Sequence, residues 1–201
     1  RYTGSGAYSY AYALGGTGTD VGYGINVDLS GNVITTGVFA SSNVNFNPSG
    51  SNTISAGTGR SIYVAGYTQC DNNFYRWTGG TSIAWGTASN WCGGVVPSST
   101  GVAVIPAGVS SFPTLSSSQT LANLVVQSGS FLNVSAALTL SGNLYNSGTL
   151  FAYNPIQTAY DVYNSGTVSG TGAILLNGTV AQNIVGTGTV SNLTINNSNG
   201  V

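Results

Sequence analysis

The side chains of this sequence that could act as acids or bases in catalysis are four carboxylates, Asp20, Asp28, Asp71 and Asp161. His, Glu and Lys, which serve most often beside Asp in general acid–base catalysis, are absent. Hydrolysis of a glycosidic bond uses two carboxylates about 5–10 Å apart. Asp20 and Asp28 could meet that condition, but Asp also hydrogen-bonds nearby backbone in turns. We favour the turn role and predict that the chain is not an enzyme.

Calcium binding is a second chemistry that the carboxylates suggest. Gly15–Asp20 reads GGTGTD, which matches the start of a calcium-binding nonapeptide. The pattern continues with a large apolar residue where this chain has Gly22, and the chain holds one copy of a motif that works in stacks. Asp20 and Asp28 are therefore candidates for a weak calcium site at most, and we predict no cofactor and no firmly bound metal.

Two cysteines and three tryptophans lie close together in the sequence. Cys70 and Cys92 are the only cysteines, and no His is present to complete a zinc site. We expect a disulfide that closes a loop of about 20 residues and contributes about 2–4 kcal/mol, which implies an oxidising, extracellular compartment. Trp77, Trp85 and Trp91 could form a platform on which sugars stack, or a small buried core. We favour the core.

The charge content limits the partners of the chain. Charged residues are 3% of the 201 residues and the net charge is −1. Three scattered Arg cannot form the basic patch that binds nucleic acid, and no apolar run reaches the length of a membrane span. A nearly uncharged surface disperses poorly in water. We expect the surface to be covered by glycans or by other copies of the chain.

The elements that would position these residues are strands. Val, Ile, Thr and Tyr recur between Gly, Asn and Ser, which predicts short strands and turns with almost no helix. Within residues 1–69 we expect antiparallel strands at 8–14, 24–28, 33–39 and 61–67. Four strands in about 60 residues is the size of one propeller blade.

The letters GGTGTDVGYGINVDLSGNVITTGVF, followed by VNFNPSG and SIYVAGY, resemble the bacterial β-propeller repeat called the SBBP repeat. The resemblance covers about residues 8–68 and implies a blade-like antiparallel sheet. A propeller needs four or more blades, and this chain has one. The edges of a lone blade must pair with something else.

Tryptophan, glycine and proline signatures recur after residue 76, at Trp77–Gly80, Asn90–Trp91, Val96–Pro97, Val104–Pro106 and Pro113–Leu115. With these signatures residues 77–201 resemble the Trp-rich and β-solenoid region of secreted surface proteins of the Bacteroidota type. We expect residues 70–97 to be a Trp-rich, disulfide-closed junction and residues 98–201 to be a β-solenoid.

A six-residue motif supports the solenoid. Tyr145–Leu150, YNSGTL, returns as YNSGTV at Tyr163–Val168, and we interpret the interval between the copies as one rung. Short apolar runs separated by Gly, Ser or Asn are typical of solenoid coils with two or three faces, whose equivalent residues stack about 4.8 Å apart. We predict a ladder of Asn146 on Asn164 and an apolar column of Leu150 on Val168. Residues 151–160 are expected to bulge outward or to contact a neighbour.

The sequence thus predicts an all-β chain: a blade-like sheet, a Trp-rich junction and a β-solenoid. The expected function is that of an extracellular structural or adhesive surface protein. Open β edges and solenoid ends would join copies into a filament, sheath or layer. The alternative is an adhesin module that binds glycans through the Trp-rich segment.

Overall fold

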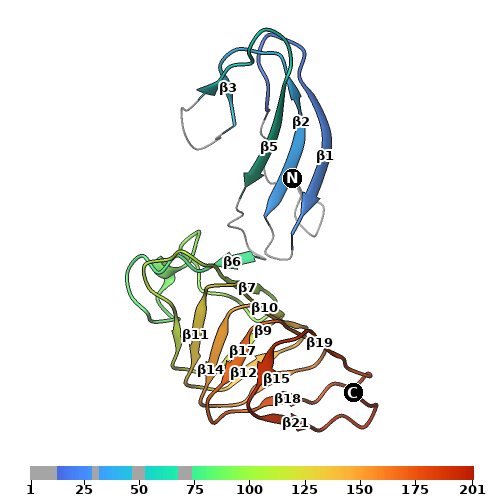
Figure 1. The fold of residues 1–201 in the computed structure, drawn as a ribbon. Helices are drawn as coiled ribbons and strands as arrows, with labels where there is room; N and C mark the ends of the chain where they lie inside the picture. Colours follow the sequence, from blue (N-terminus) through green and yellow to red (C-terminus); the bar gives the residue numbers. More distant parts are fainter. Residues whose placement is uncertain (1–12, 29–31, 47–52, 68–73) are drawn as a thin grey trace. The chain divides into compact units, whose positions relative to one another are not determined.

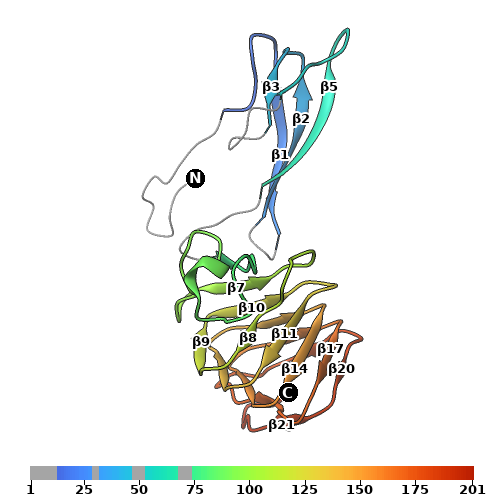
Figure 2. The same cartoon turned by 90° about the vertical axis from the view of Figure 1, so that its left-hand side faces the viewer.

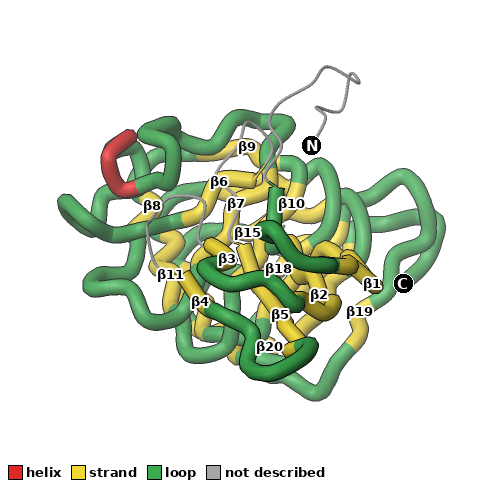
Figure 3. Tube along the Cα trace, turned by 90° about the horizontal axis from the view of Figure 1, so that it is seen from above, coloured by secondary structure: helices red, strands yellow, loops and turns green. Residues whose placement is uncertain are grey.

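The computed structural model describes residues 13–28, 32–46, 53–67 and 74–201. The chain is all-β, as predicted, and the described residues contain a single short 3-10 helix, η1 (Ala88–Asn90), drawn red in Figure 3. The chain divides into two compact units, Arg1–Thr68 and Gln69–Val201. This division lies one residue before the predicted end of the first segment at residue 69, and the predicted boundary at residue 97 lies within the second unit.

The first unit is built on a three-stranded antiparallel sheet, ordered β1-β2-β5 (Figure 1). Its strands are β1 (Val21–Val27), β2 (Val33–Phe39) and β5 (Ser61–Tyr67). A register shift between Gly22 and Gly24 marks a bulge in β1. A small second sheet pairs β3 (Val44–Asn45) with β4 (Thr53–Ile54). The predicted strand at 8–14 lies almost wholly outside the described residues.

Apolar side chains point to both faces of this sheet, because Val and Ile occupy consecutive as well as alternate positions. Paired residues of antiparallel strands share a face, and the register therefore groups Ile34, Ile62 and Val64 together. Ile62 is 80% exposed and Val64 74% exposed. On the opposite face, Phe39 is buried with its ring 5.2 Å from that of Phe46. We call the first of these the Ile62 face.

The second unit is a β-solenoid of about five turns (Figure 2). Each turn, or rung, contributes one strand to each of three parallel sheets. The strands of the first sheet are β6 (Phe74–Arg76), β7 (Val102–Ile105), β10 (Asn123–Val126), β13 (Leu144–Asn146), β16 (Val162–Asn164) and β19 (Ile184–Val185). The second sheet contains β8 (Thr114–Leu115), β11 (Phe131–Val134), β14 (Thr149–Ala152), β17 (Thr167–Ser169) and β20 (Thr189–Val190). The third contains β9 (Gln119–Leu121), β12 (Leu138–Leu140), β15 (Ile156–Thr158), β18 (Ile174–Leu176) and β21 (Leu193–Ile195).

The alternation of each strand places one set of side chains inside the coil. Leu144 and Val162 are partners in register, as are Leu150 and Val168, and none of the four is more than 2% exposed. Both pairs have the same separation in the sequence as the two copies of the repeated motif. The parallel pairing therefore stacks equivalent positions of successive rungs, and the interior is largely apolar.

Residues 151–160 differ from the expected outward bulge. Ile156–Thr158 forms β15, the third face of its rung, and pairs with β12 on one side and β18 on the other. Ile156 and Thr158 are fully buried. The bulge was predicted because these residues lack the repeated letters, but stacking does not require identical side chains. Ile156 is apolar, and the buried Thr158 hydroxyl donates to the carbonyl oxygen of Gly142 at 2.8 Å.

The predicted junction, residues 70–97, is not separate from the solenoid in its described part. Strand β6 pairs in parallel with β7 and begins the first sheet, and Ala84 forms a bridge with Thr114 of the second. The three tryptophans belong to the same buried cluster as Leu115 and the rest of the solenoid interior. Residues 74–97 therefore close the first rung, and we call them the N-terminal cap.

Candidate functional site

The two ends of the solenoid differ, and this difference defines the candidate site. At the first rung the inward side chains of Ala103, Ile105, Leu115 and Leu121 are all fully buried. At the last rung, made of β19, β20 and β21, the inward residues are partners of buried residues one rung earlier; Val190 of β20 is partly buried, whereas those of β19 and β21 are exposed. Their exposed fractions are 41% for Ile184, 44% for Leu193 and 56% for Ile195.

The register explains why these three side chains have the position of interior residues. Ile184 pairs with Val162, while Leu193 and Ile195 pair with Ile174 and Leu176. Among the described strands, none lies on the far side of this rung, which is opposite β6 and β7 in the stack (Figures 1 and 2). The last rung is therefore an apolar surface bordered by the final strand of each sheet.

The last rung has no charged side chain. Asp161 is the last charged side chain of the sequence, so residues 162–201 carry none. They also contain no Pro. Exposed strand edges are usually protected against pairing by Lys, Pro or a covering segment. Within residues 162–201 the last rung is therefore an uncharged and largely apolar surface.

One corner of the last rung is closed by Gln182, a buried residue that no sequence motif singled out. Its side-chain amide donates to the carbonyl oxygens of Thr158 and Tyr160, at 3.0 and 2.5 Å. Its Oε1 accepts from Gly178 N and Asn197 Nδ2, at 2.8 and 2.9 Å. With both ends of the amide bonded, Gln182 fixes the corner while the three strands stay open.

The N-terminal cap is closed by the three tryptophans. Trp77, Trp85 and Trp91 are at most 2% exposed, and Trp91 packs edge to face against both others, with ring centroids 5.1 and 4.6 Å away. Sugars bind to aromatic faces that are open to solvent, and these faces contact one another. The interpretation of the tryptophans as a glycan-stacking platform is therefore wrong, and the core role holds.

Hydrogen bonds hold the tryptophans in place. Trp77 Nε1 donates to the carbonyl oxygen of Ser111 at 2.7 Å, and Trp91 Nε1 donates to that of Trp85 at 2.7 Å. Buried Asn90 holds the loop between Trp77 and Trp85. Its Oδ1 accepts from the backbone N–H groups of Thr81 and Ser82 at 2.9 and 2.8 Å. The Asn90–Trp91 signature pointed to this segment but not to the bonding role of Asn90.

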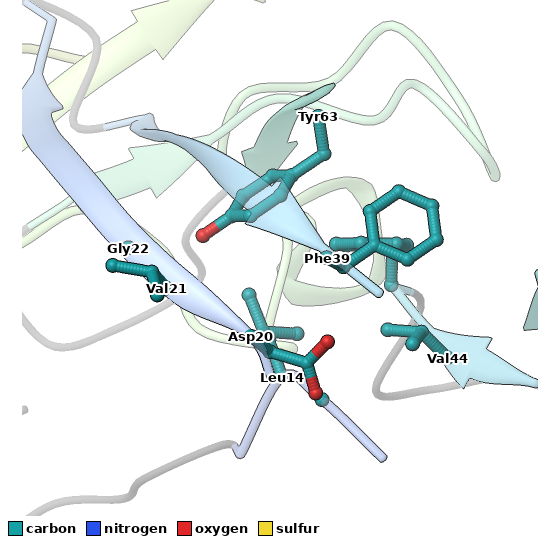
Figure 4. Close-up of a pocket in the computed structure, with 9 residues that line it drawn as sticks. Leu14, Asp20, Val21, Gly22, Phe39, Val44 and Tyr63 are labelled. Atoms are coloured by element: carbon teal, nitrogen blue, oxygen red, sulfur yellow. The ribbon is translucent and has the colours of Figure 1, made fainter. Parts of the chain in front are cut away.

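Asp20 lies in the first unit beside a cavity of about 40 Å³, whose other labelled lining residues include Leu14, Phe39, Val44 and Tyr63 (Figure 4). Its Oδ2 accepts from the Ser41 hydroxyl at 2.6 Å and from Gly16 N at 2.8 Å. Its Oδ1 accepts from Ala40 N and Ser41 N at 3.1 and 3.3 Å. The Ser41 hydroxyl, followed by Gly16 N–H, lowers the pKa of Asp20.

These donors give Asp20 a turn-stabilising role in the first unit. Asp28 likewise accepts from Asn32, through the backbone N–H at 2.9 Å and the side-chain amide at 2.7 Å. Within the described ranges no group of three His, Cys, Asp or Glu is placed to hold a metal ion. Asp20 and Asp28 thus both stabilise turns, the role favoured from the sequence, and a weak calcium site at these residues remains a prediction. The cavity beside Asp20 has room for about one or two water molecules.

The predicted ladder lies inside the solenoid. Asn146 and Asn164 are partners in register, and Asn146 Nδ2 donates to Asn164 Oδ1 at 2.8 Å. Asn164 Nδ2 continues to the carbonyl oxygen of Thr189 at 3.2 Å. A Cβ on Gly166 would collide with the carbonyl oxygen of Gly148, which explains why the motif keeps Gly at this corner.

On the outside of the same strands, Tyr145 and Tyr163 stack with ring centroids 4.9 Å apart and planes inclined by 9°. The Tyr163 hydroxyl donates to Asp161 Oδ2 at 3.3 Å, and the Asp161 charge raises the pKa of Tyr163. Because the ring faces cover each other, this pair offers mainly edges to solvent. It extends the ladder on the outer surface and is a poor platform for a sugar.

The predicted disulfide involves one described residue, Cys92, which is half-buried in the N-terminal cap. Its backbone N–H donates to the carbonyl oxygen of Arg76 at 2.8 Å, which holds it beside β6. Cys70 and Asp71 lie outside the described residues. The Cys70–Cys92 pairing therefore remains a prediction.

No protein-family model, curated protein or solved structure matches the chain. Among the described residues, no helix has the length and apolar character needed to cross a membrane. The geometry of the chain itself is therefore the basis for assigning a function.

Proposed function

We propose that the chain is an extracellular structural or adhesive surface protein that self-assembles into a filament, sheath or layer. The observation that carries this proposal is the exposure of Ile62 and Val64, which are 80% and 74% exposed on the Ile62 face. Burying an apolar side chain of this size stabilises by about 1.5–3 kcal/mol. An assembly that covers both side chains is therefore more stable than the isolated chain.

A second surface is needed for an assembly that continues beyond two copies. Among the described strands of the first unit, β1 and β5 are the outer strands of the three-stranded sheet, so each presents an edge that can accept another strand. The Ile62 face supplies exposed apolar side chains at Ile34, Ile62 and Val64. A self-associating face together with open strand edges on one chain is sufficient to link copies into an open array.

The low charge supports the same proposal. Like charges on two copies repel one another and keep proteins apart, but this chain has seven charged side chains, three basic and four acidic, and a net charge of −1. The expected Cys70–Cys92 disulfide and the resemblance of the sequence to secreted surface proteins are the grounds for an extracellular location. Because the tryptophans are buried, we propose glycans only as a coating of the protein surface and not as ligands of the Trp-rich segment.

Electron microscopy of the purified chain tests this function. Concentrated wild-type protein should form elongated or layered particles, and Ile62→Lys/Val64→Lys protein should form smaller ones. Both changed residues are largely exposed, so the variant should fold.

A variant with the same added charge serves as the control. Thr17→Lys/Thr58→Lys places two lysines at exposed positions of loops, outside the strands of the sheet. Its particles should match those of wild type, because the Ile62 face is intact. Free single particles of wild-type protein at every concentration would refute the proposal.

A further inference from the structure

The outer surface of the first solenoid sheet holds two tyrosine rings in contact. Tyr145 of β13 and Tyr163 of β16 are partners in register, and their rings stack with centroids 4.9 Å apart and planes inclined by 9°. In the part of the chain that the structure describes, this is the one ring contact between two tyrosines. Both strands have a neighbour on each side in the sheet, so the pair belongs to the middle of the stack.

Hydrogen bonds hold the two phenol groups in the same orientation. The Tyr145 hydroxyl accepts from Asn143 Nδ2 at 2.9 Å, and the Tyr163 hydroxyl donates to Asp161 Oδ2 at 3.3 Å. Asn143 and Asp161 are themselves joined across the rungs, because Asp161 N donates to Asn143 Oδ1 at 2.9 Å. Each ring therefore has its hydroxyl beside that of the other ring, and so do the ring carbons next to the hydroxyls. Tyr163 is 38% exposed and Tyr145 is half-buried, which leaves the pair open to an oxidant.

We propose that Tyr145 and Tyr163 are a site of oxidative cross-linking, at which a carbon–carbon bond joins the two rings within one chain. The oxidant is hydrogen peroxide, used by a haem peroxidase. Each phenol loses one electron and its hydroxyl proton, and the two phenoxyl radicals couple through one Cε atom of each ring. The hydrogen on each coupled carbon then moves as a proton to the oxygen, which restores both phenols. In the net reaction two hydrogens leave the protein, and one peroxide molecule is reduced to two water molecules.

The geometry favours each part of this reaction. Two radicals in solution must first meet, whereas these rings are already held together by the sheet. The Asp161 charge raises the pKa of Tyr163, so Tyr163 is a neutral phenol near neutral pH and must release its proton when it is oxidised. The Asp161 carboxylate already accepts the hydrogen bond of this hydroxyl and can take up that proton. The Tyr145 proton passes to solvent.

The cross-link would act as a covalent staple between two rungs. It constrains the unfolded chain in the way that a disulfide does, but reducing agents do not break a carbon–carbon bond. The inference goes beyond the proposed self-assembly, because the reaction needs one chain only. It agrees with the oxidising, extracellular location that we propose for the protein.

Oxidation of the full chain followed by peptide mapping tests the inference. Dilute wild-type protein is treated with hydrogen peroxide and a haem peroxidase, reduced, and cleaved with a protease that cuts before Asp residues. Cleavage before Asp161 releases residues 161–201, in which Tyr163 is the single tyrosine. Mass spectrometry should find this fragment joined to residues 71–160, which contain Tyr145, at a mass two hydrogens below the sum of the two. Gel filtration before cleavage should show that the product is still one chain.

Two variants identify the partner of Tyr163. Tyr145→Phe keeps the stacked ring but removes the hydroxyl that oxidation requires, so the linked fragment should be lost. Tyr160→Phe is the matched control, because Tyr160 lies in the same fragment and is 51% exposed. Its linked fragment should form as in wild type. Circular dichroism checks that both variants are folded.

Three outcomes would overturn the inference. The first is the absence of the linked fragment in wild type under conditions that couple free tyrosine. The second is an undiminished linked fragment in Tyr145→Phe, and the third is a link found only in material with the mass of two chains. These outcomes leave the proposed self-assembly untouched, and a chain that failed to self-assemble could still form the cross-link.

Discussion

Asn146 Nδ2 donates a hydrogen bond of 2.8 Å to Asn164 Oδ1 inside the solenoid, where the two residues are 1% and 3% exposed. The bond joins the two copies of the YNSGT motif across adjacent rungs. It is a polar contact in an otherwise apolar column, and it fixes which residue of one rung faces which residue of the next. A shift in register would leave both amides without this bond.

Asn164→Ala should destabilise the solenoid by about 1–3 kcal/mol, because it removes the acceptor of buried Asn146 and the donor to Thr189. Urea denaturation followed by tryptophan fluorescence measures the change. Ser165→Ala, at the next and exposed position, should stay within about 0.5 kcal/mol of wild type. Equal effects of the two substitutions would contradict the buried ladder.

Trp91→Ala should cost about 3–5 kcal/mol of stability, because the ring fills the centre of the cap between Trp77 and Trp85. Thermal unfolding measures this cost. Ile83→Ala, in the same segment but at a residue that is 55% exposed, should have a much smaller effect. A stable Trp91→Ala protein that had lost binding to glycans would instead restore the platform interpretation.

Asp20 should titrate below its ordinary pKa of 3.8, because the Ser41 hydroxyl and the Gly16 N–H stabilise its charged form. A lowered folded-state pKa adds stability above pH 3.8, and that stability is lost as the pH falls through the lowered pKa. NMR titration of the Asp20 carboxyl carbon gives the midpoint directly. Ser41→Ala should raise it, and a wild-type midpoint at or above 3.8 would show that the donors do not act on the charge.

The two cysteines should carry no reactive thiol in the chain isolated from its source. Alkylation of the denatured, unreduced protein should leave its mass unchanged, and alkylation after reduction should add two groups. Mass spectrometry resolves the two states. Addition of two groups before reduction would show that the disulfide is absent. The main chemical reason to expect an oxidising compartment would then be lost.

The repeated motif predicted part of the solenoid well, and its physical basis explains why. Identical letters at Tyr145–Thr149 and Tyr163–Thr167 mark positions that stack with the same side chain, so the interval between them is the rung length there. Other rungs are longer, as the pairing of Leu124 with Leu144 and of Val162 with Ile184 shows. Because corners vary in length and inward positions accept any apolar residue, those rungs leave no repeat in the sequence.

Residue types predicted a tryptophan core and open solenoid ends, but not the bonds that build the cap or which end the cap closes. Burial of Trp77 depends on a bond to Ser111, 34 residues away in the sequence, and composition cannot distinguish such a ring from an exposed one. Leu193 and Ile195 have the same apolar character as Leu138 and Leu140, and only their place in the last rung of the stack leaves them uncovered. Exposure here depends on the neighbouring rung and not on the strand's own sequence.

Light scattering across a concentration series tests the central claim, self-assembly, most directly. The mass of wild-type protein should rise from the 20.3 kDa of one chain toward multiples of that value as concentration increases. Added salt should not reverse the rise, because apolar contacts and not charges hold the copies together. A mass that remained at that of a single chain at the highest concentration would contradict the claim.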